Sequence, residues 1–202
     1  MSTINKPNKF LPTTLEEMHD RGWYELDVVL ITGDAYIDSP FMGIAVVGRI
    51  LEDMGLRVGI IGQPDVNSDV DVSRLGEPKL FWGVSGGSID SMVSNYTATK
   101  RFRSSDDYTP GGKNDKRPDR ATLVYTNLIR RYFKGTVPIV LGGIEASLRR
   151  LTHYDYWSDK LRKPILFDTK ADYMVYGMGE QAIIDLGNTL KAGGDPRNIR
   201  GL

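Results

Sequence analysis

Short apolar runs rich in β-branched residues alternate along the chain with stretches of helical periodicity. Runs that are apolar throughout predict strands buried on both faces, as in a parallel sheet. Five such runs lie at residues 26–32, 56–61, 80–85, 137–141 and 172–176. Each of them is followed by a Gly-bearing turn, which is typical of the passage from a strand into a helix.

Between the runs, apolar residues recur at three- and four-residue spacing, which predicts amphipathic helices. After Pro40, one predicted helix face carries Ile44, Val47, Leu51 and Met54. Further helices are predicted at 89–96, 119–133 and around 183–190. Strands that alternate with helices predict an α/β fold. We expect a five-stranded, doubly wound parallel sheet that is flavodoxin-like, with strand order 2-1-3-4-5.

We expect one α/β domain over residues 26–202, preceded by an N-terminal arm of residues 1–25. Two insertions interrupt the pattern. Residues 101–118 are polar and rich in Pro, Gly and basic residues, which predicts an exposed, mobile segment. Residues 152–170 are dense in aromatic and basic side chains. That composition is compatible with packing against another domain, with contact to a substrate or with binding of single-stranded nucleic acid.

The composition of the chain excludes several classes of function. The 202 residues carry 26 basic and 26 acidic side chains, so no overall field attracts nucleic acid or a membrane, and we expect neither as a partner. There is no cysteine and there are only two histidines, which excludes an iron–sulfur cluster or a Zn–Cys site within these residues. No apolar run approaches the ~18 residues of a membrane span, and the first residues do not form a secretory signal. We therefore expect a cytoplasmic location.

The ends of three predicted strands carry the candidate ligand site. Gly-bearing turns follow the third, fourth and fifth strands, and the carboxyl ends of parallel strands meet at one edge of a sheet, where ligands bind. Gly also serves turns that bind nothing, and Glu145 and Glu180 can either compensate helix dipoles or recognise a ligand hydroxyl. The chain lacks the glycine patterns of a dinucleotide site and of a P-loop. The candidate residues are Asp34, Ser85, Gly86, Gly87, Gly142, Gly143, Glu145, Gly177, Gly179 and Glu180. No catalytic or metal-binding residue is predicted.

Several long motifs resemble the N-terminal region of YgiQ-type radical SAM proteins. They occupy residues 30–36, 108–113, 141–150, 153–159 and 175–180. The resemblance implies that a radical SAM barrel lies beyond Leu202 and that its cysteines hold an iron–sulfur cluster which cleaves S-adenosylmethionine. The full-length protein would then be an enzyme of undefined substrate. The present chain has no cysteine and is expected to be inactive alone.

The region also resembles the cobalamin-binding domains that precede many radical SAM barrels. Asp34, Ser85 and the pair Gly142-Gly143 match their pattern. Tyr36 stands where that pattern has the histidine that binds cobalt, Ser39 replaces a glycine, and Gly87 replaces a leucine. The resemblance implies the fold, whereas the departures lead us to expect that cobalamin binds weakly or not at all.

Two functions of different class follow. The chain is either an accessory domain of a radical SAM enzyme that contributes substrate binding, or a stand-alone module that binds a nucleotide or corrinoid at the carboxyl edge of the sheet. In the first case its partners are an unknown small-molecule substrate and the barrel of the same polypeptide, contacted through residues 152–170.

Overall fold

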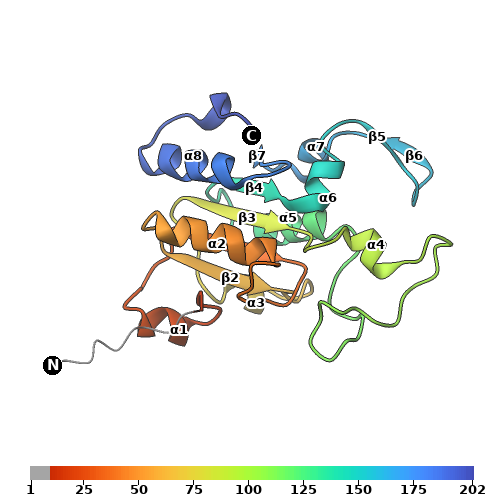
Figure 1. The fold of residues 1–202 in the computed structure, drawn as a ribbon, viewed down its shortest axis with the longest axis horizontal. Coiled ribbons are helices and arrows are strands. Elements are labelled where there is room, and N and C mark those ends of the chain that lie inside the picture. Colours follow the sequence, from red (N-terminus) through yellow and green to blue (C-terminus); the bar gives the residue numbers. More distant parts are fainter. Residues whose placement is uncertain (1–9) are drawn as a thin grey trace.

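The computed structural model describes residues 10–202 and centres on a five-stranded parallel sheet (Figure 1). The sheet order is β2-β1-β3-β4-β7, so the predicted order of the five strands is confirmed. The strands are β1 (Val28–Thr32), β2 (Val58–Gly62), β3 (Phe81–Ser85), β4 (Ile139–Gly142) and β7 (Tyr173–Met174). The strands start one to two residues later than the apolar runs, because the first residues of each run belong to the preceding loop.

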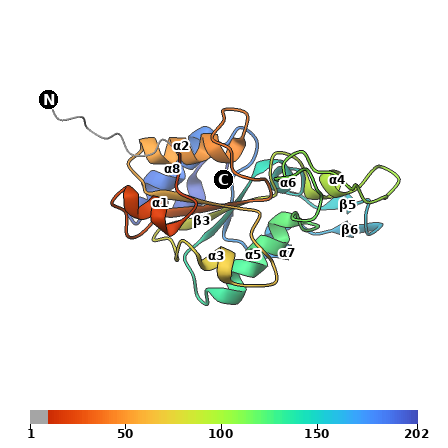
Figure 2. The ribbon, with the colours of Figure 1, turned by 90° about the horizontal axis from the view of Figure 1, so that it is seen from below.

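Helices cover both faces of the sheet (Figure 2). On one face, α2 (Gly43–Asp53) and α8 (Glu180–Lys191) pack against each other and on the sheet. On the other face lie α3 (Val70–Ser73) and the longer α5 (Ala121–Tyr132), with α1 (Leu15–Asp20) at the side. The result is a doubly wound α/β sandwich with a separate apolar core on each face.

The described part of the N-terminal arm packs onto this domain. Leu11 is buried in the core beneath α2, and Met18 of α1 is buried in the opposite core. The carbonyl oxygen of Pro12 accepts a hydrogen bond from the amide of Ile60 in β2. Residues 1–9 of the predicted arm lie outside the described residues.

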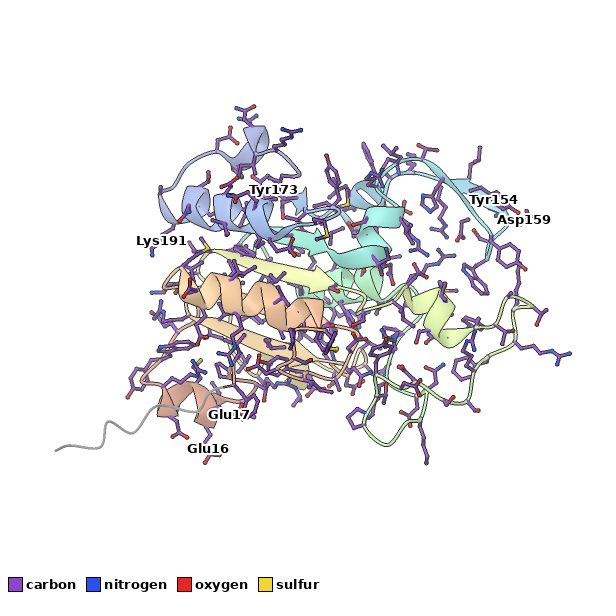
Figure 3. All side chains as sticks on the ribbon, viewed as in Figure 1. Glu16, Glu17, Tyr154, Asp159, Tyr173 and Lys191 are labelled. Atoms are coloured by element: carbon purple, nitrogen blue, oxygen red, sulfur yellow. The ribbon has the colours of Figure 1, made fainter. Side chains whose placement is uncertain are left out.

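Two segments far apart in sequence form a protrusion that we call the insertion lobe, residues 96–120 and 149–170. It contains the hairpin of β5 (His153–Asp155) and β6 (Lys160–Arg162) and the short α7 (Ile165–Thr169). Tyr96 packs against Trp157 with tilted rings whose centroids are 5.3 Å apart, and the hydroxyl of Tyr156 donates to the carbonyl of Ala98. Figure 3 shows Tyr154 and Asp159 at the outer end of the hairpin.

Two predictions for this region need correction. The helix expected at 89–96 is only α4 (Ser91–Asn95), because Tyr96 is already extended and pairs with Phe102. The first insertion is not simply an exposed segment, since four of its polar residues are buried: Asp106, Thr109, Asn114 and Arg117. Buried polar contacts fix its shape, and such contacts cannot be predicted from the pattern of apolar residues.

Two short elements complete the fold. Helix α6 (Gly143–Leu148) begins directly at the end of β4 and packs against β3 and β4. The last element, η1 (Pro196–Asn198), contacts α8.

Candidate functional site

A cleft of about 420 Å³ lies between α2 and α8, over the central strands β1, β3 and β4. It extends to the carboxyl edge of the sheet, where the turns after these strands line it. A cleft of this size falls in the range that holds small organic ligands. Its position is the one at which open α/β sheets bind ligands.

The lining changes along the strands from apolar to small and polar. Side chains of a strand alternate between the two faces of the sheet, so every second residue faces α2 and α8. The strand register places Thr32, Ser85 and Gly142 side by side in one row at the carboxyl edge. Behind that row lie the apolar side chains of Leu30, Phe81 and Val140, together with Gly83. The interior is therefore apolar, and hydroxyls and backbone lie near the edge.

Two glycines of the cleft have no structural reason to lack a side chain. Gly43 begins α2 and Gly142 ends β4, and neither has a positive φ. A Cβ atom built on either would meet no other atom within 4 Å. No other glycine of the chain combines ordinary backbone conformation with open space, because the rest have positive φ or a neighbouring atom in contact. Both residues line the cleft, and the space beside each of them is open.

The structure brings eight of the ten candidate residues to this cleft. They are Asp34, Ser85, Gly87, Gly142, Gly143, Gly177, Gly179 and Glu180. The other two, Gly86 and Glu145, do not line it. Gly86 instead packs against the side chain of Glu145, whose carboxylate would lie 2.5 Å from an added Cβ.

Glu145 is a structural capping group rather than a cleft residue. Its side chain is buried, and one carboxylate oxygen accepts the amide of Ser91, the first residue of α4, at 2.9 Å. The other accepts the amide of Thr122, in the first turn of α5, at 3.0 Å. Both amides are among those that a helix leaves unpaired at its start, and a carboxylate there also compensates the helix dipole. Glu145 lies in the first turn of α6, as expected, but its hydrogen bonds go to the starts of α4 and α5.

Asp34 lines the cleft but is held from behind by a buried ion-pair network. Its carboxylate lies 2.8 Å from the Arg117 guanidinium and accepts the amide of Ser88 at 2.6 Å. Arg117 also pairs with Asp106 at 3.2 Å and donates to the carbonyl of Gly86 at 2.8 Å. All three charged side chains are at most 2% exposed. The first insertion therefore fixes the turns after β1 and β3 that form the cleft mouth.

Sequence reasoning missed the cleft residues that are not at strand ends. Gly43, Ile44 and Val47 of α2 form one wall, and Val175 and Ile183 contribute to the opposite side. The helical periodicity marked Ile44 and Val47 as core, and half-buried helix positions at a cleft give the same pattern as core positions. Within residues 10–202, no group of three His, Cys, Asp or Glu side chains is arranged to hold a metal ion. No helix in that range is long and apolar enough to cross a membrane.

The fold and cleft define an α/β domain with a ligand-sized cavity at the carboxyl edge of its sheet. The chain belongs to the family of radical SAM N-terminal domains, whose family model matches residues 10–202. This confirms the resemblance seen in the motifs.

Curated relatives are considerably longer than the chain. A UPF0313 protein of Fusobacterium nucleatum is 62% identical over 195 residues, covering 96% of this chain and 34% of that protein. A UPF0313 protein of Thermotoga maritima is 58% identical over 196 residues, covering 96% and 34%. One of Methanocella arvoryzae is 55% identical over 191 residues, covering 93% and 32%. The chain thus spans about a third of the length of these relatives. No solved structure matches it.

The iron–sulfur cluster implied by the radical SAM family has no ligands in this chain. An iron–sulfur cluster needs thiolate ligands, and the sequence has no cysteine. The family implies an iron–sulfur cluster and S-adenosylmethionine for the full-length protein, and these 202 residues supply no thiolate for such a cluster.

Proposed function

We propose that the chain is the accessory domain of a radical SAM protein and that it binds a small organic substrate or ligand in the cleft between α2 and α8. The observation that carries this proposal is the pair Gly43 and Gly142, whose missing side chains enlarge a cavity already lined by the strand-end turns. Neither position needs the conformational freedom of glycine. The open space beside both residues therefore supports a binding cavity.

A screen of metabolites by native mass spectrometry and thermal shift tests this proposal. We expect at least one compound class to bind the wild-type chain and to raise its Tm, because binding to the folded state alone stabilises it. Gly142→Leu should remove that binding while the variant stays folded, since an added side chain meets no atom near its Cβ. Ala192→Leu adds a similar apolar group at the exposed end of α8 and serves as the control. Ligands that bind Gly142→Leu as tightly as wild type would contradict the site.

A stand-alone module for a nucleotide or corrinoid is the second candidate. It is favoured by the fact that the cleft between the Gly turns is already open in the chain by itself. A cavity formed before the ligand arrives is the usual condition of a binding module. The two candidates differ in whether the ligand acts only together with the catalytic part of a longer polypeptide.

We also propose that the insertion lobe contacts the barrel of the same polypeptide, chiefly through residues 152–170. Large side chains in that segment are strongly exposed, with Tyr154 at 59%, Leu161 at 77% and Phe167 at 70%. Exposed apolar groups that gather in one region are typical of interaction surfaces. The two segments of the lobe hold thirteen basic and seven acidic side chains within a chain of zero net charge. The barrel surface that fits this lobe would be acidic, and the compartment we propose for the assembly is the cytoplasm.

A further inference from the structure

The polar groups that line the cleft limit the kind of ligand it can take. No Lys, Arg or His side chain is among the residues that line it. The two acidic residues there are Asp34 and Glu180. Asp34 already pairs with Arg117, and Glu180 is exposed at the start of α8. Among the side chains that line the cleft, none therefore offers a positive charge to an anion, and none is a free buried carboxylate for a cation.

The other polar side chains in the cleft are neutral hydroxyls. Thr32 Oγ1 accepts the amide of Asp34 at 3.2 Å, and Ser85 Oγ accepts the amide of Gly87 at 3.0 Å. These two hydroxyls keep their own protons for a neutral acceptor on a ligand, whereas the third, Ser88 Oγ, donates to the sulfur of Met42 at 3.7 Å. Such groups orient a ligand, but they cannot offset the removal of a full charge from water.

We infer that the group which enters the cleft between α2 and α8 is uncharged and largely apolar, such as an aromatic ring system. This inference rests on the proposed function, because it specifies the ligand class of the same cleft. Leu30, Phe81 and Val140 form the sheet side of the space it occupies, and Val47 and Ile183 contribute from the two helices. Gly43 and Gly142 provide the room. Any charged portion of the ligand stays at the mouth, outside this apolar part.

Two fluorescent dyes that share one ring skeleton test the inference. N-phenylnaphthylamine is neutral, whereas anilinonaphthalene sulfonate carries an additional sulfonate. In fluorescence titrations of the 202-residue chain at neutral pH, we expect the neutral dye to bind at least about tenfold more tightly, since a buried sulfonate would be desolvated without a partner. Naphthylmethylamine, which is protonated at that pH, should fail to displace the neutral dye.

Variants assign the signal to the cleft. Gly142→Leu and, independently, Gly43→Leu should abolish binding of the neutral dye, and Ala192→Leu should leave it unchanged. Far-UV circular dichroism of each variant checks that it is folded, and the two cleft positions lie on different elements, so one misfolded variant does not remove the test.

The outcomes separate the inference from the proposed function. If the sulfonate dye binds as tightly as the neutral dye and Gly142→Leu blocks both, the cleft is a ligand site but the inferred ligand class is wrong. The same holds if the ammonium compound displaces the neutral dye. If neither cleft variant changes the binding of any dye, the cleft is not a ligand site and both proposals fall.

Discussion

Arg117 is the residue on which the junction between the first insertion and the sheet depends. Its guanidinium pairs with Asp34 and Asp106, and all three side chains are buried. Sequence analysis placed Arg117 in an exposed segment, because a buried ion pair leaves no apolar pattern. The same packing explains why Gly87 has no side chain, because a Cβ atom there would lie 2.4 Å from the Arg117 guanidinium.

Replacing Arg117 by Met should destabilise the fold strongly. The change keeps most of the side-chain volume but leaves two buried carboxylates without a cation, which costs about 3–5 kcal/mol. Urea unfolding followed by circular dichroism measures the loss. Lys116→Met is the matched control, because Lys116 is exposed and its replacement should change the free energy of unfolding by less than about 0.5 kcal/mol. Equal stabilities of the two variants would show that the network contributes nothing.

Asp155 makes the stability of the insertion lobe depend on pH. Burial alone would raise the pKa of Asp155, but hydrogen bonds from Arg120 and Ser158 hold it well below its usual range. Its folded pKa is thus lower than its unfolded value of about 3.9. The stabilisation is present above the unfolded pKa and is lost as the pH falls toward the folded pKa.

We therefore expect Asp155→Asn to be less stable than wild type at neutral pH, with a difference that shrinks below about pH 4. Urea unfolding of both proteins at several pH values measures this difference. Asp115→Asn, at an exposed position of the same lobe, should show no such trend. A gap between wild type and Asp155→Asn that grows on acidification would refute the assignment.

At the scale of elements, two glutamates in similar turns have different positions. Glu145 and Glu180 each follow a Gly-bearing turn near the start of a helix, and sequence analysis treated them alike. In the fold, Glu145 is buried and joins the starts of α4 and α5, whereas Glu180 is exposed at the start of α8.

Glu145→Ala should lower the free energy of unfolding by about 1–3 kcal/mol or more, because two buried amides lose their acceptor. Hydrogen exchange should accelerate first at the amides of Ser91 and Thr122. Glu180→Ala should change stability by less than about 1 kcal/mol, since only a helix-dipole interaction is lost. Comparable destabilisation by both substitutions would mean that Glu145 does not cap the two helices.

The regular elements followed from the sequence because their causes are local. Apolar runs and helical periodicity located the five strands, α2, α5 and α8, since burial on the sheet imposes those patterns. Helix α4 was predicted too long, because Tyr96 fits the helical spacing but is held in an extended conformation by its bridge to Phe102. That contact belongs to the insertion lobe, and periodicity does not report it.

At the scale of the whole molecule, most of the candidate site could be located from the strand ends alone. Parallel strands bring their carboxyl ends together, so the glycines after β3 and β4 and those before α8 had to meet at one edge. What the sequence could not show is which side of that edge is open. Glu145 and Gly86 face the packed α4 and α5, whereas Gly142 faces the cleft, and only the packing of helices distinguishes these positions.

The distribution of charge over the surface is a second property that only the folded molecule shows. The zero total led to the expectation that nucleic acid is not a partner. The fold gathers an excess of basic side chains in the insertion lobe and leaves the rest of the chain with an excess of acidic ones. Electrostatic interactions with a partner depend on this local distribution rather than on the total.

Cobalamin binding tests how far the relationship to corrinoid-binding domains extends. Tyr36, which stands in place of the cobalt-binding histidine, does not line the cleft; its hydroxyl accepts the amide of Leu11 at 3.3 Å. Burial also raises the pKa of Tyr36, which disfavours the phenolate form that would bind a metal. Phe41 lines the cleft and is 92% exposed, where it would meet a large ligand entering from the carboxyl edge.

Titration of hydroxocobalamin into the chain should therefore give no saturable change of the corrin spectrum in the low micromolar range. The double variant Tyr36→His with Ser39→Gly restores the histidine and the glycine of the corrinoid-binding pattern, and it provides the informative comparison. If only that variant gives a spectral change typical of imidazole coordination, then Tyr36 and Ser39, in the turn after β1, decide whether the chain binds cobalt. Saturable binding by the wild-type chain, lost in Gly142→Leu but not in Ala192→Leu, would instead establish a corrinoid site that needs no protein ligand to cobalt.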